Sequence, residues 1–328
     1  MSSARPDVVV VGAGVIGLTT AVCLAEAGVR VLVRTAEAPR QTTSAVAGAL
    51  CGPTITGPDD PATGWGDIAE AEFTALSGQR ETGIRLMRGR LVSKLGEAPP
   101  SWASTLPGYA QCSTQETPAG FPVAFWARIP VADMPRYLDY LLDRLAAAGG
   151  RIELGAVSAL AEAAAQAPVV VNCTGASART FAADDHVRAV RGQHVIVENP
   201  GLDSFLHEGG AESAWTSFLP HSDRVVLGGV AVQNSWHRGP DAELTRQILT
   251  RCIDVEPRLA DARILGVEVG LRPGRTTVRL EQEPLGGGRC IHNYGHGGLG
   301  VTLSWGCARD VLAIVIGDTD ERVAHRVL

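Results

Sequence analysis

Three glycines near the N-terminus have the spacing of a phosphate-binding turn. Gly12, Gly14 and Gly17 form a G-x-G-x-x-G pattern directly after a run of four valines at residues 8–11. In such a turn the first glycine permits the tight bend, the second lets the backbone approach a pyrophosphate, and the third lets helix and strand pack closely. The N-terminus of the following helix, with Val15 and Ile16, then presents amide hydrogens to the phosphates. The pattern predicts a dinucleotide-binding site.

The residues after the second strand do not decide which dinucleotide would bind. The second apolar strand ends at Arg34-Thr35-Ala36-Glu37, about twenty positions after the glycines. Glu37 could reach a ribose hydroxyl from the loop, whereas Arg34 could face a 2′-phosphate, with Thr35 beside it. FAD, NAD and NADP all remain compatible with this turn.

A second glycine-rich turn lies almost three hundred residues later. Residues 295–300 read Gly-His-Gly-Gly-Leu-Gly, between a late apolar strand at 290–293 and helical spacing at 302–316. The N-termini of both helices can point at one ligand. The second helix dipole would stabilise the negative charge that develops on a flavin when it is reduced. The alternative is an ordinary glycine-rich connection.

Strands and helices alternate between these turns. Apolar spacing predicts helices at 18–27 and 133–148 and strands at 29–33, 151–154, 168–172 and 224–232. The Gly-, Pro- and Asp-rich stretch 54–64 is expected to be a loop that crosses between domains. Alternation of this kind favours an α/β fold with a doubly wound parallel sheet.

Composition restricts the function classes. The chain has 328 residues, 45% apolar and 20% charged, with a formal charge of −6 and no long charge runs. This length predicts about two domains, and the lack of a basic stripe argues against nucleic acid or an anionic membrane as partner. We expect no membrane span, because no run reaches about eighteen apolar residues. There is no room for a signal peptide before the first strand, so we predict a cytoplasmic protein.

Cysteine and histidine spacing predicts no metal site. The seven cysteines are scattered, odd in number and without C-x-x-C spacing, which is typical of reduced thiols. His292 and His296 are four apart but straddle a strand end and a glycine turn, where this spacing does not place two ligands on one face.

Ordered segments from end to end resemble the D-amino-acid oxidase family of FAD enzymes. Besides the N-terminal fingerprint they are Thr42-Thr43-Ser44 with Ala47-Gly48, Val171-Asn172-Cys173-Thr174-Gly175, Arg191-Gly192-Gln193, Gly270-Leu271-Arg272-Pro273, Val278-Arg279-Leu280-Glu281, Asn293-Tyr294-Gly295-His296-Gly297-Gly298, Thr302 and Trp305-Gly306-Cys307. This resemblance implies that the dinucleotide is FAD rather than NADP.

The resemblance implies a fold and a reaction. A doubly wound Rossmann-type FAD-binding domain would comprise residues 1–60, 128–190 and 288–328, and a mixed-sheet α+β substrate domain residues 61–127 and 191–287. The α-hydrogen of an amino acid, D-configured or modified, would pass as hydride to flavin N5. The imine would hydrolyse to a keto acid and ammonia, and oxygen would take up the electrons as hydrogen peroxide. No protein base is needed if the substrate amine is neutral.

The resemblance also assigns residues. Arg279 would clamp the substrate carboxylate, since a planar guanidinium is the best two-point partner for a carboxylate. The Gly298 carbonyl would accept from the substrate amine, while Arg272 and Arg275 would serve structure or flavin-side electrostatics. The other residues expected to bind the cofactor are Thr42, Thr43, Ser44, Ala47, Gly48, Val157, Cys173, Thr174, Gly175, Gly297, Gly298, Leu299, Gly300 and Thr302.

The chain departs from the family where substrate would bind. The substrate tyrosine aligns with Ser217, the stretch from Gly209 to Trp215 lacks the second tyrosine, and Cys51, Pro53 and Thr54 replace Trp and Pro-Tyr. Two explanations stay open: a wide, polar pocket for a bulky or N-substituted amino acid, or a pocket closed by Trp215. Both predict poor turnover of small neutral D-amino acids.

Three functions therefore compete. They are a D-amino-acid oxidase, an oxidase or dehydrogenase of a secondary amine, and a non-catalytic FAD-binding protein; the retained Arg279 and Gly298 argue against the last. The expected partners are an amino acid and molecular oxygen, with a homodimer left open and a dissociable rather than covalent FAD.

Overall fold

The computed structural model describes residues 5–53, 60–210 and 213–324. Its longer helices are α1 (Val15–Glu26), α2 (Pro61–Leu76), α3 (Met134–Ala147), α6 (Ala242–Val255) and α7 (Gly300–Ala324), and the short ones are α4 (Leu160–Ala164) and α5 (Ala178–Phe181). The strands are β1 (Val8–Val11), β2 (Val31–Thr35), β3 (Ile84–Ser93), β4 (Ala110–Gln111), β5 (Val123–Ala132), β6 (Arg151–Leu154), β7 (Val169–Asn172), β8 (Arg188–Glu198), β9 (Phe205–Glu208), β10 (Ala214–Pro220), β11 (Arg224–Val230), β12 (Val232–Gln233), β13 (Ile264–Leu285) and β14 (Gly288–His296).

The described strands form one continuous mixed sheet. Its order is β4-β5-β3-β9-β10-β11-β8-β13-β14-β7-β1-β2-β6, with β12 paired to β8. The stretch β14-β7-β1-β2-β6 is parallel, and Val8 lies between Val31 and Val169. All four β1 valines are buried, as expected of a central parallel strand covered on both faces. This is the predicted doubly wound half, and the rest is the predicted mixed sheet.

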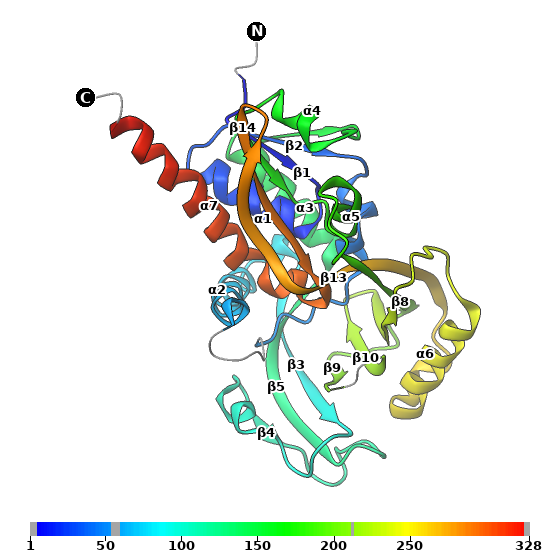
Figure 1. Ribbon diagram of the computed structural model, residues 1–328. Helices are drawn as coiled ribbons and strands as arrows, with labels where there is room; N and C mark the ends of the chain where they lie inside the picture. The colour runs from blue at the N-terminus through cyan, green and yellow to red at the C-terminus, as the bar shows by residue number, and fades with distance from the viewer. Residues whose placement is uncertain (1–4, 54–59, 211–212, 325–328) are drawn as a thin grey trace.

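Helices cover the parallel strands on both faces. The largest core cluster joins α1, α3 and α7 to β1, β2 and β7, and a second cluster packs α4 against the opposite face. Ten of the twelve α1 residues are buried, which explains why this helix is apolar all round. In Figure 1, α7 runs beside α1 on one side of β14, and α4 and α5 lie on the other.

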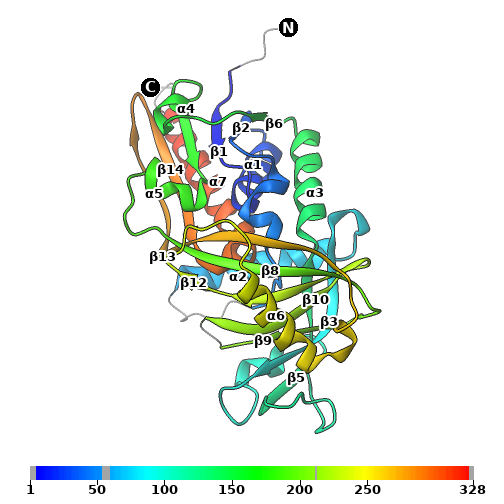
Figure 2. The same cartoon turned by 90° about the vertical axis from the view of Figure 1, so that its right-hand side faces the viewer.

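One long strand connects the two halves. The first part of β13 pairs with β8 from Ile264 to Gly274, and its last part pairs with β14 from Arg279 to Leu285, after a register shift. Figure 1 shows β13 leaving β14 and bending towards β8. In Figure 2, α6 lies across the mixed sheet; its Ile248 and Cys252 pack on that face. The bend places the end of the parallel sheet near the face of the mixed sheet that lies opposite α6.

Part of the predicted loop at 54–64 is helix. Residues 54–59 lie outside the described ranges, but α2 begins at Pro61, and the Asp60 side chain accepts a hydrogen bond from Ala62 N at 2.9 Å. An aspartate N-cap followed by proline at the first helical position is a strong helix start. Phe73 and Leu76 of α2 pack into the cluster with α1, α3 and α7. We therefore propose that α2 belongs with the parallel half, although residue 61 was the expected start of the substrate domain.

The C-terminal helix is longer and more apolar than expected. Residues Gly297–Gly317 are long and apolar enough to cross a membrane, contrary to the expectation that no segment would be. Half of this segment is buried inside the protein, where Trp305, Ala308 and Val311 pack against the core. Burial by neighbouring helices explains the apolar composition of α7 as that of a core helix.

Candidate active site

A cavity of about 1020 Å³ lies between the two halves. Its walls come from the carboxyl ends of β1, β2 and β7, the loop at 42–53, the start of α7, and the face of the mixed sheet opposite α6. The carboxyl edge of a parallel sheet is where open α/β folds bind ligands. The cavity is at the upper end of the usual size for ligand sites, about 300–1,000 Å³.

The first glycine turn is built as the fingerprint predicts. Gly12 has φ +111°, and a Cβ there would lie 2.4 Å from the Cys173 carbonyl oxygen. A Cβ on Gly17 would lie 1.9 Å from the Gly12 carbonyl oxygen, so Gly17 serves turn and helix packing and does not line the cavity. Gly14 faces the cavity, and Val15 N donates to Ser44 Oγ at 2.9 Å. The turn thus leaves backbone, rather than side chains, facing a ligand.

All predicted cofactor residues except Gly17 line this one cavity. They are Gly12, Gly14, Val15, Ile16, Arg34, Thr35, Thr42, Thr43, Ser44, Ala47, Gly48, Val157, Cys173, Thr174, Gly175, Gly297, Gly298, Leu299, Gly300 and Thr302. Thr302 is the third residue of α7 rather than its start, because the helix begins at Gly300.

The hydroxyl loop at 42–44 uses its side chains to fix its own position. Thr42 Oγ1 donates to Pro39 O at 2.7 Å, Ser44 Oγ accepts from α1, and Thr43 Oγ1 accepts from Leu271 N at 3.2 Å. The loop is therefore tied at once to the first glycine turn and to β13.

The far end of the cavity holds the charged residues that left the dinucleotide open. Arg34 and Glu37 both line it. Arg34 is 3.8 Å from Glu162, and Glu37 pairs with Arg238 at 3.2 Å. Both side chains therefore already have an ion-pair partner, and their ion pairs alone do not choose between a ribose hydroxyl and a 2′-phosphate.

The structure does not bring Arg279, the expected carboxylate clamp, among the described residues that line the cavity. Its guanidinium donates to Glu281 at 2.6 Å, Glu283 at 3.0 Å and the Tyr294 hydroxyl at 2.8 Å. The reason is that β13 changes its partner strand between Arg272 and Arg279, with a register shift after Gly274. The outer arginine therefore belongs to an ion-pair cluster beside β14.

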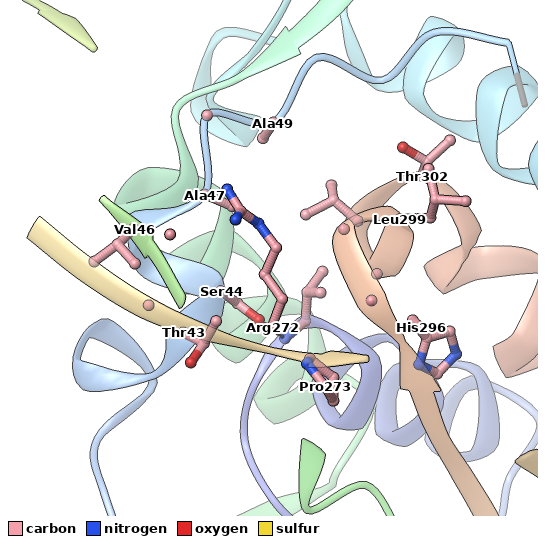
Figure 3. Close-up of a pocket in the computed structure, with 18 of the residues that line it drawn as sticks. Thr43, Ser44, Val46, Ala47, Ala49, Arg272, Pro273, His296, Leu299 and Thr302 are labelled. Atoms are coloured by element: carbon pink, nitrogen blue, oxygen red, sulfur yellow. Dashed lines mark hydrogen bonds between the residues drawn. The ribbon is translucent and has the colours of Figure 1, made fainter. Parts of the chain in front are cut away.

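Of Arg272 and Arg279, Arg272 is the one that lines the cavity. In Figure 3 its side chain rises from β13 into the space between Ala47–Ala49 and Leu299. Its Nη1 donates to Val230 O at 2.9 Å, and the guanidinium lies over Gly192, where a Cβ would be 2.6 Å from both terminal nitrogens. Burial alone lowers the pKa of the Arg272 guanidinium, and no carboxylate of the described residues forms an ion pair with it. A half-buried cation without a counter-ion is suited to bind an anionic group.

The second glycine turn lies beside Arg272. Gly297 has φ +55° and the turn Gly297–Leu299 leads directly into α7. A Cβ on Gly298 would be 3.8 Å from Arg272 Cδ. The backbone of this turn, the N-terminus of α7 and the guanidinium thus border the same part of the cavity.

Ser217 and Trp215 both line the cavity, as the two open explanations require. Ser217 Oγ is 3.3 Å from His207 Nδ1, and the Trp215 ring centroid lies 5.5 Å from Arg272 Cζ. The small Ser217 leaves room beyond it, while Trp215 closes the wall beside the guanidinium. The wide polar pocket and the pocket closed by Trp215 both stay predictions.

The structure adds residues that the sequence analysis did not name. His194 lines the cavity, and its Nδ1 is 2.7 Å from Val46 O. Since a carbonyl only accepts, Nδ1 carries the proton and Nε2 is an acceptor. Burial and the charge of Arg272 lower the pKa of His194 to about 4. The spacing signal that could have found it is Gly192-x-His194, two positions on the same face of β8.

Beyond Ser217 the cavity continues into an apolar chamber, which we define by Leu50, Leu91, Trp102, Val123, Phe125, Ile129 and Leu219. The chamber is formed where β3, β5 and β10 come together. Among the described residues of β3, β5 and the segment between them, no charged side chain lines the cavity. The sequence analysis missed this chamber because its residues come from separate segments.

A family model described as FAD dependent oxidoreductase, DAO, matches residues 7–313. This chain belongs to that family. It is 46% identical to a D-amino-acid oxidase of Rubrobacter xylanophilus over 308 residues, 93% of this chain and 94% of the relative. It is 48% identical to a D-amino-acid oxidase of Streptomyces coelicolor over 311 residues, 93% and 95% of the two chains, and 33% identical to human D-aspartate oxidase over 96% and 95%.

Solved structures agree in fold. Glycine oxidase from Geobacillus kaustophilus superposes with a TM-score of 0.79 at 19% identity, over 95% of each chain. Iminodiacetate oxidase from Chelativorans sp. gives 0.74 at 17% identity, over 94% of this chain and 95% of that one. At these identities the comparison shows the FAD-enzyme fold alone, which confirms the predicted fold class.

The DAO-family protein is an FAD-dependent oxidoreductase, and its cavity fits the cofactor. The glycine turn at Gly12–Gly17 would hold the pyrophosphate, Glu37 and Val157 border the nucleotide end, and the turn before α7 borders the opposite end. A Cβ at Gly12 or Gly17 would collide with backbone, so the cradle depends on glycine.

Proposed function

We propose that this protein oxidises a free D-amino acid with a large apolar side chain. The observation that carries the proposal is Arg272: a half-buried guanidinium without a carboxylate partner among the described residues, lining the same cavity as the cofactor residues. The relatives of 46% and 48% identity, both named D-amino-acid oxidase, support the D configuration.

The chain's own residues would bind and orient the substrate. Arg272 would hold the carboxylate by two parallel hydrogen bonds, which only a planar fork provides. The Gly298 carbonyl would accept from the amine, so that substrate is held at two points. FAD held at the Gly12–Gly17 turn would supply the two-electron acceptor for the α-hydrogen; the substrate would leave as an imino acid that water hydrolyses to a keto acid and ammonia, with oxygen as the final electron acceptor, giving hydrogen peroxide.

The apolar chamber supports the side-chain preference. Trp102, Phe125 and Leu91 offer dispersion contacts and apolar burial but no partner for a charged group. Burying an aspartate-like carboxylate there without a partner would be strongly unfavourable. We therefore propose that acidic D-amino acids are poor substrates, although a D-aspartate oxidase is among the relatives.

Two alternative functions also have to be considered. The open chamber would also admit an N-substituted, secondary amine, with an acceptor other than oxygen. A non-catalytic FAD-binding role is disfavoured, because such a protein gains nothing from a guanidinium without a carboxylate partner in its cavity. We further propose a cytoplasmic location, since all seven cysteines are free thiols; the homodimer also stays a proposal.

The deciding experiment is anaerobic mixing of the yellow holoprotein with amino acids. D-phenylalanine and D-leucine should bleach the flavin band rapidly, while L-phenylalanine, D-aspartate and N-methyl-D-phenylalanine should bleach it slowly. Faster bleaching by the N-methyl compound would establish the secondary-amine alternative, and no bleaching by any compound would establish the non-catalytic one.

A further inference from the structure

Trp215 is placed to control the orientation of Arg272. It is half-buried on β10, lines the cavity, and its ring centroid lies 5.5 Å from Arg272 Cζ. A guanidinium within about 6 Å of an indole face is attracted by the ring quadrupole, most strongly where water is excluded. Trp215 therefore interacts directly with the Arg272 guanidinium, in addition to lining the cavity.

Two neighbouring residues of β11, Gly229 and Val230, contact the Trp215 ring and the Arg272 guanidinium. A Cβ on Gly229 would lie 2.6 Å from Trp215 Cε2 and Cζ2, so the indole lies directly on the Gly229 backbone. The next residue, Val230, accepts the hydrogen bond from Arg272 Nη1 at 2.9 Å. Arg251 of α6 donates to the Gly229 carbonyl at 3.2 Å, which ties this end of β11 to the helix. The ring and the guanidinium thus share one backbone support.

The Gly192 backbone also packs against the guanidinium. A Cβ there would be 2.6 Å from both Nη atoms. Since the Gly192 backbone lies on one side and the indole is close by, the long arginine side chain has few rotamers left. Without the indole, the side chain would regain freedom and lose the orientation that a two-point carboxylate contact needs.

We propose that Trp215 is a positioning residue that holds the Arg272 guanidinium ready for the substrate carboxylate. In this chain it takes over from the tyrosine expected at position 217, where Ser217 is too short to support a ligand. The inference rests on the proposed function in taking Arg272 as the carboxylate anchor.

The test compares a carboxylate with its neutral isostere. Benzoate and benzamide share a ring, but only benzoate needs the guanidinium. Each is titrated into holoprotein and followed by the change in the flavin absorption spectrum. Trp215→Leu should weaken benzoate at least tenfold and benzamide less than threefold, whereas Trp215→Phe, which keeps a ring face, should weaken benzoate less than Trp215→Leu does.

A matched variant and a double mutant separate positioning from wall contact. Trp102→Leu removes the other cavity tryptophan and should weaken both ligands alike. In an Arg272→Leu background, Trp215→Leu should have no further effect on benzoate, because its action passes through the arginine. Equal losses for benzoate and benzamide in Trp215→Leu, or an undiminished effect in the double mutant, would overturn the positioning role.

The controls also separate this inference from the proposed function. If Arg272→Leu alone leaves benzoate binding unchanged, the carboxylate anchor and the positioning role both fail. If Arg272→Leu weakens benzoate selectively and Trp215→Leu does not, only the positioning role fails. Should Trp215→Leu not retain FAD, Trp215→Met, which fills similar space without a ring face, gives the same comparison.

Discussion

At the scale of single residues, the site depends on which of two arginines faces inward. Arg272 and Arg279 lie in adjacent family-like segments, and both have the chemistry to bind a carboxylate. Their partners decide between them: Arg279 is neutralised by Glu281 and Glu283, whereas Arg272 has only a backbone carbonyl and an aromatic ring. The absence of a counter-ion among its described neighbours is the reason that we propose Arg272 as the carboxylate anchor.

Replacing the two arginines in turn should therefore give opposite results. Arg272→Leu should raise the D-phenylalanine concentration for half-maximal flavin reduction at least a hundredfold, on the order of 3 kcal/mol for a charged bidentate contact. Arg279→Leu should leave that concentration within about threefold and lower the stability by about 1–2 kcal/mol, since partly exposed ion pairs contribute little. Anaerobic titration and thermal unfolding measure both quantities; the reverse assignment would restore Arg279 as the clamp.

The buried histidines give a pH dependence with a definite sign. Burial and the charge of Arg272 lower the pKa of His194 in the folded chain to about 4, below its unfolded value near 6.5. The unfolded state therefore binds more protons between these values, so the folding stability is fully present above pH 6.5 and falls as the pH drops towards 4.

Removing His194 should flatten this profile. In His194→Gln the amide can still donate to Val46 O, but the side chain does not titrate, so the melting temperature should fall less between pH 7 and pH 5 than in the parent. His237, which is exposed, provides the control, and His237→Gln should keep the parent profile. An unchanged profile in His194→Gln would show that His194 is not held neutral.

At the scale of elements, features set by neighbouring residues could be predicted from the sequence, whereas features set by distant strand pairing could not. The β1–turn–α1 unit follows from valines, glycine spacing and a helix pattern within twenty residues, and α3 follows from its leucines in the same way. The extent of α2 was missed because Asp60 and Pro61 stand in a stretch that otherwise resembles a loop. The role of Arg272 was missed because it depends on where β13 exchanges β8 for β14, and no local pattern records a change of partner strand.

The glycine turn offers a test at this scale. Gly17→Ala puts a methyl group 1.9 Å from the Gly12 carbonyl oxygen, so the turn must open and FAD should be lost during purification. Gly317 of α7 is also helical but has nothing within 4 Å, so Gly317→Ala should retain FAD and gain up to about 1 kcal/mol in stability. The ratio of absorbance at the flavin band to that at the protein band compares them. Full retention of FAD by Gly17→Ala would contradict the proposed cradle.

At the scale of the whole molecule, the cavity exists because one bent strand brings two differently built halves together. The parallel half contributes the glycine turns, and the mixed sheet contributes Arg272, His194 and the chamber. The family-like segments already located both glycine turns. The residues that the mixed sheet contributes could not be predicted, because Leu91 and Phe125 become neighbours only when β3 pairs with β5.

The chamber makes the substrate preference adjustable. The parent should use D-phenylalanine at least tenfold better, by kcat/KM, than D-alanine or D-aspartate, because apolar burial is available and charge compensation is not. Leu91→Arg places a cation in the chamber and should narrow the ratio of D-phenylalanine to D-aspartate, with Leu91→Met as the size control. An unchanged ratio in Leu91→Arg would mean that substrate side chains do not enter the chamber.

The most direct measurement is a crystal structure of the holoprotein with FAD and benzoate. The account predicts FAD along the cavity from Gly14 to Gly298, with the benzoate carboxylate within hydrogen-bond distance of both terminal nitrogens of Arg272 and its ring towards the chamber. A carboxylate bound at Arg279, or one held away from the cofactor with Arg272 left empty, would contradict it.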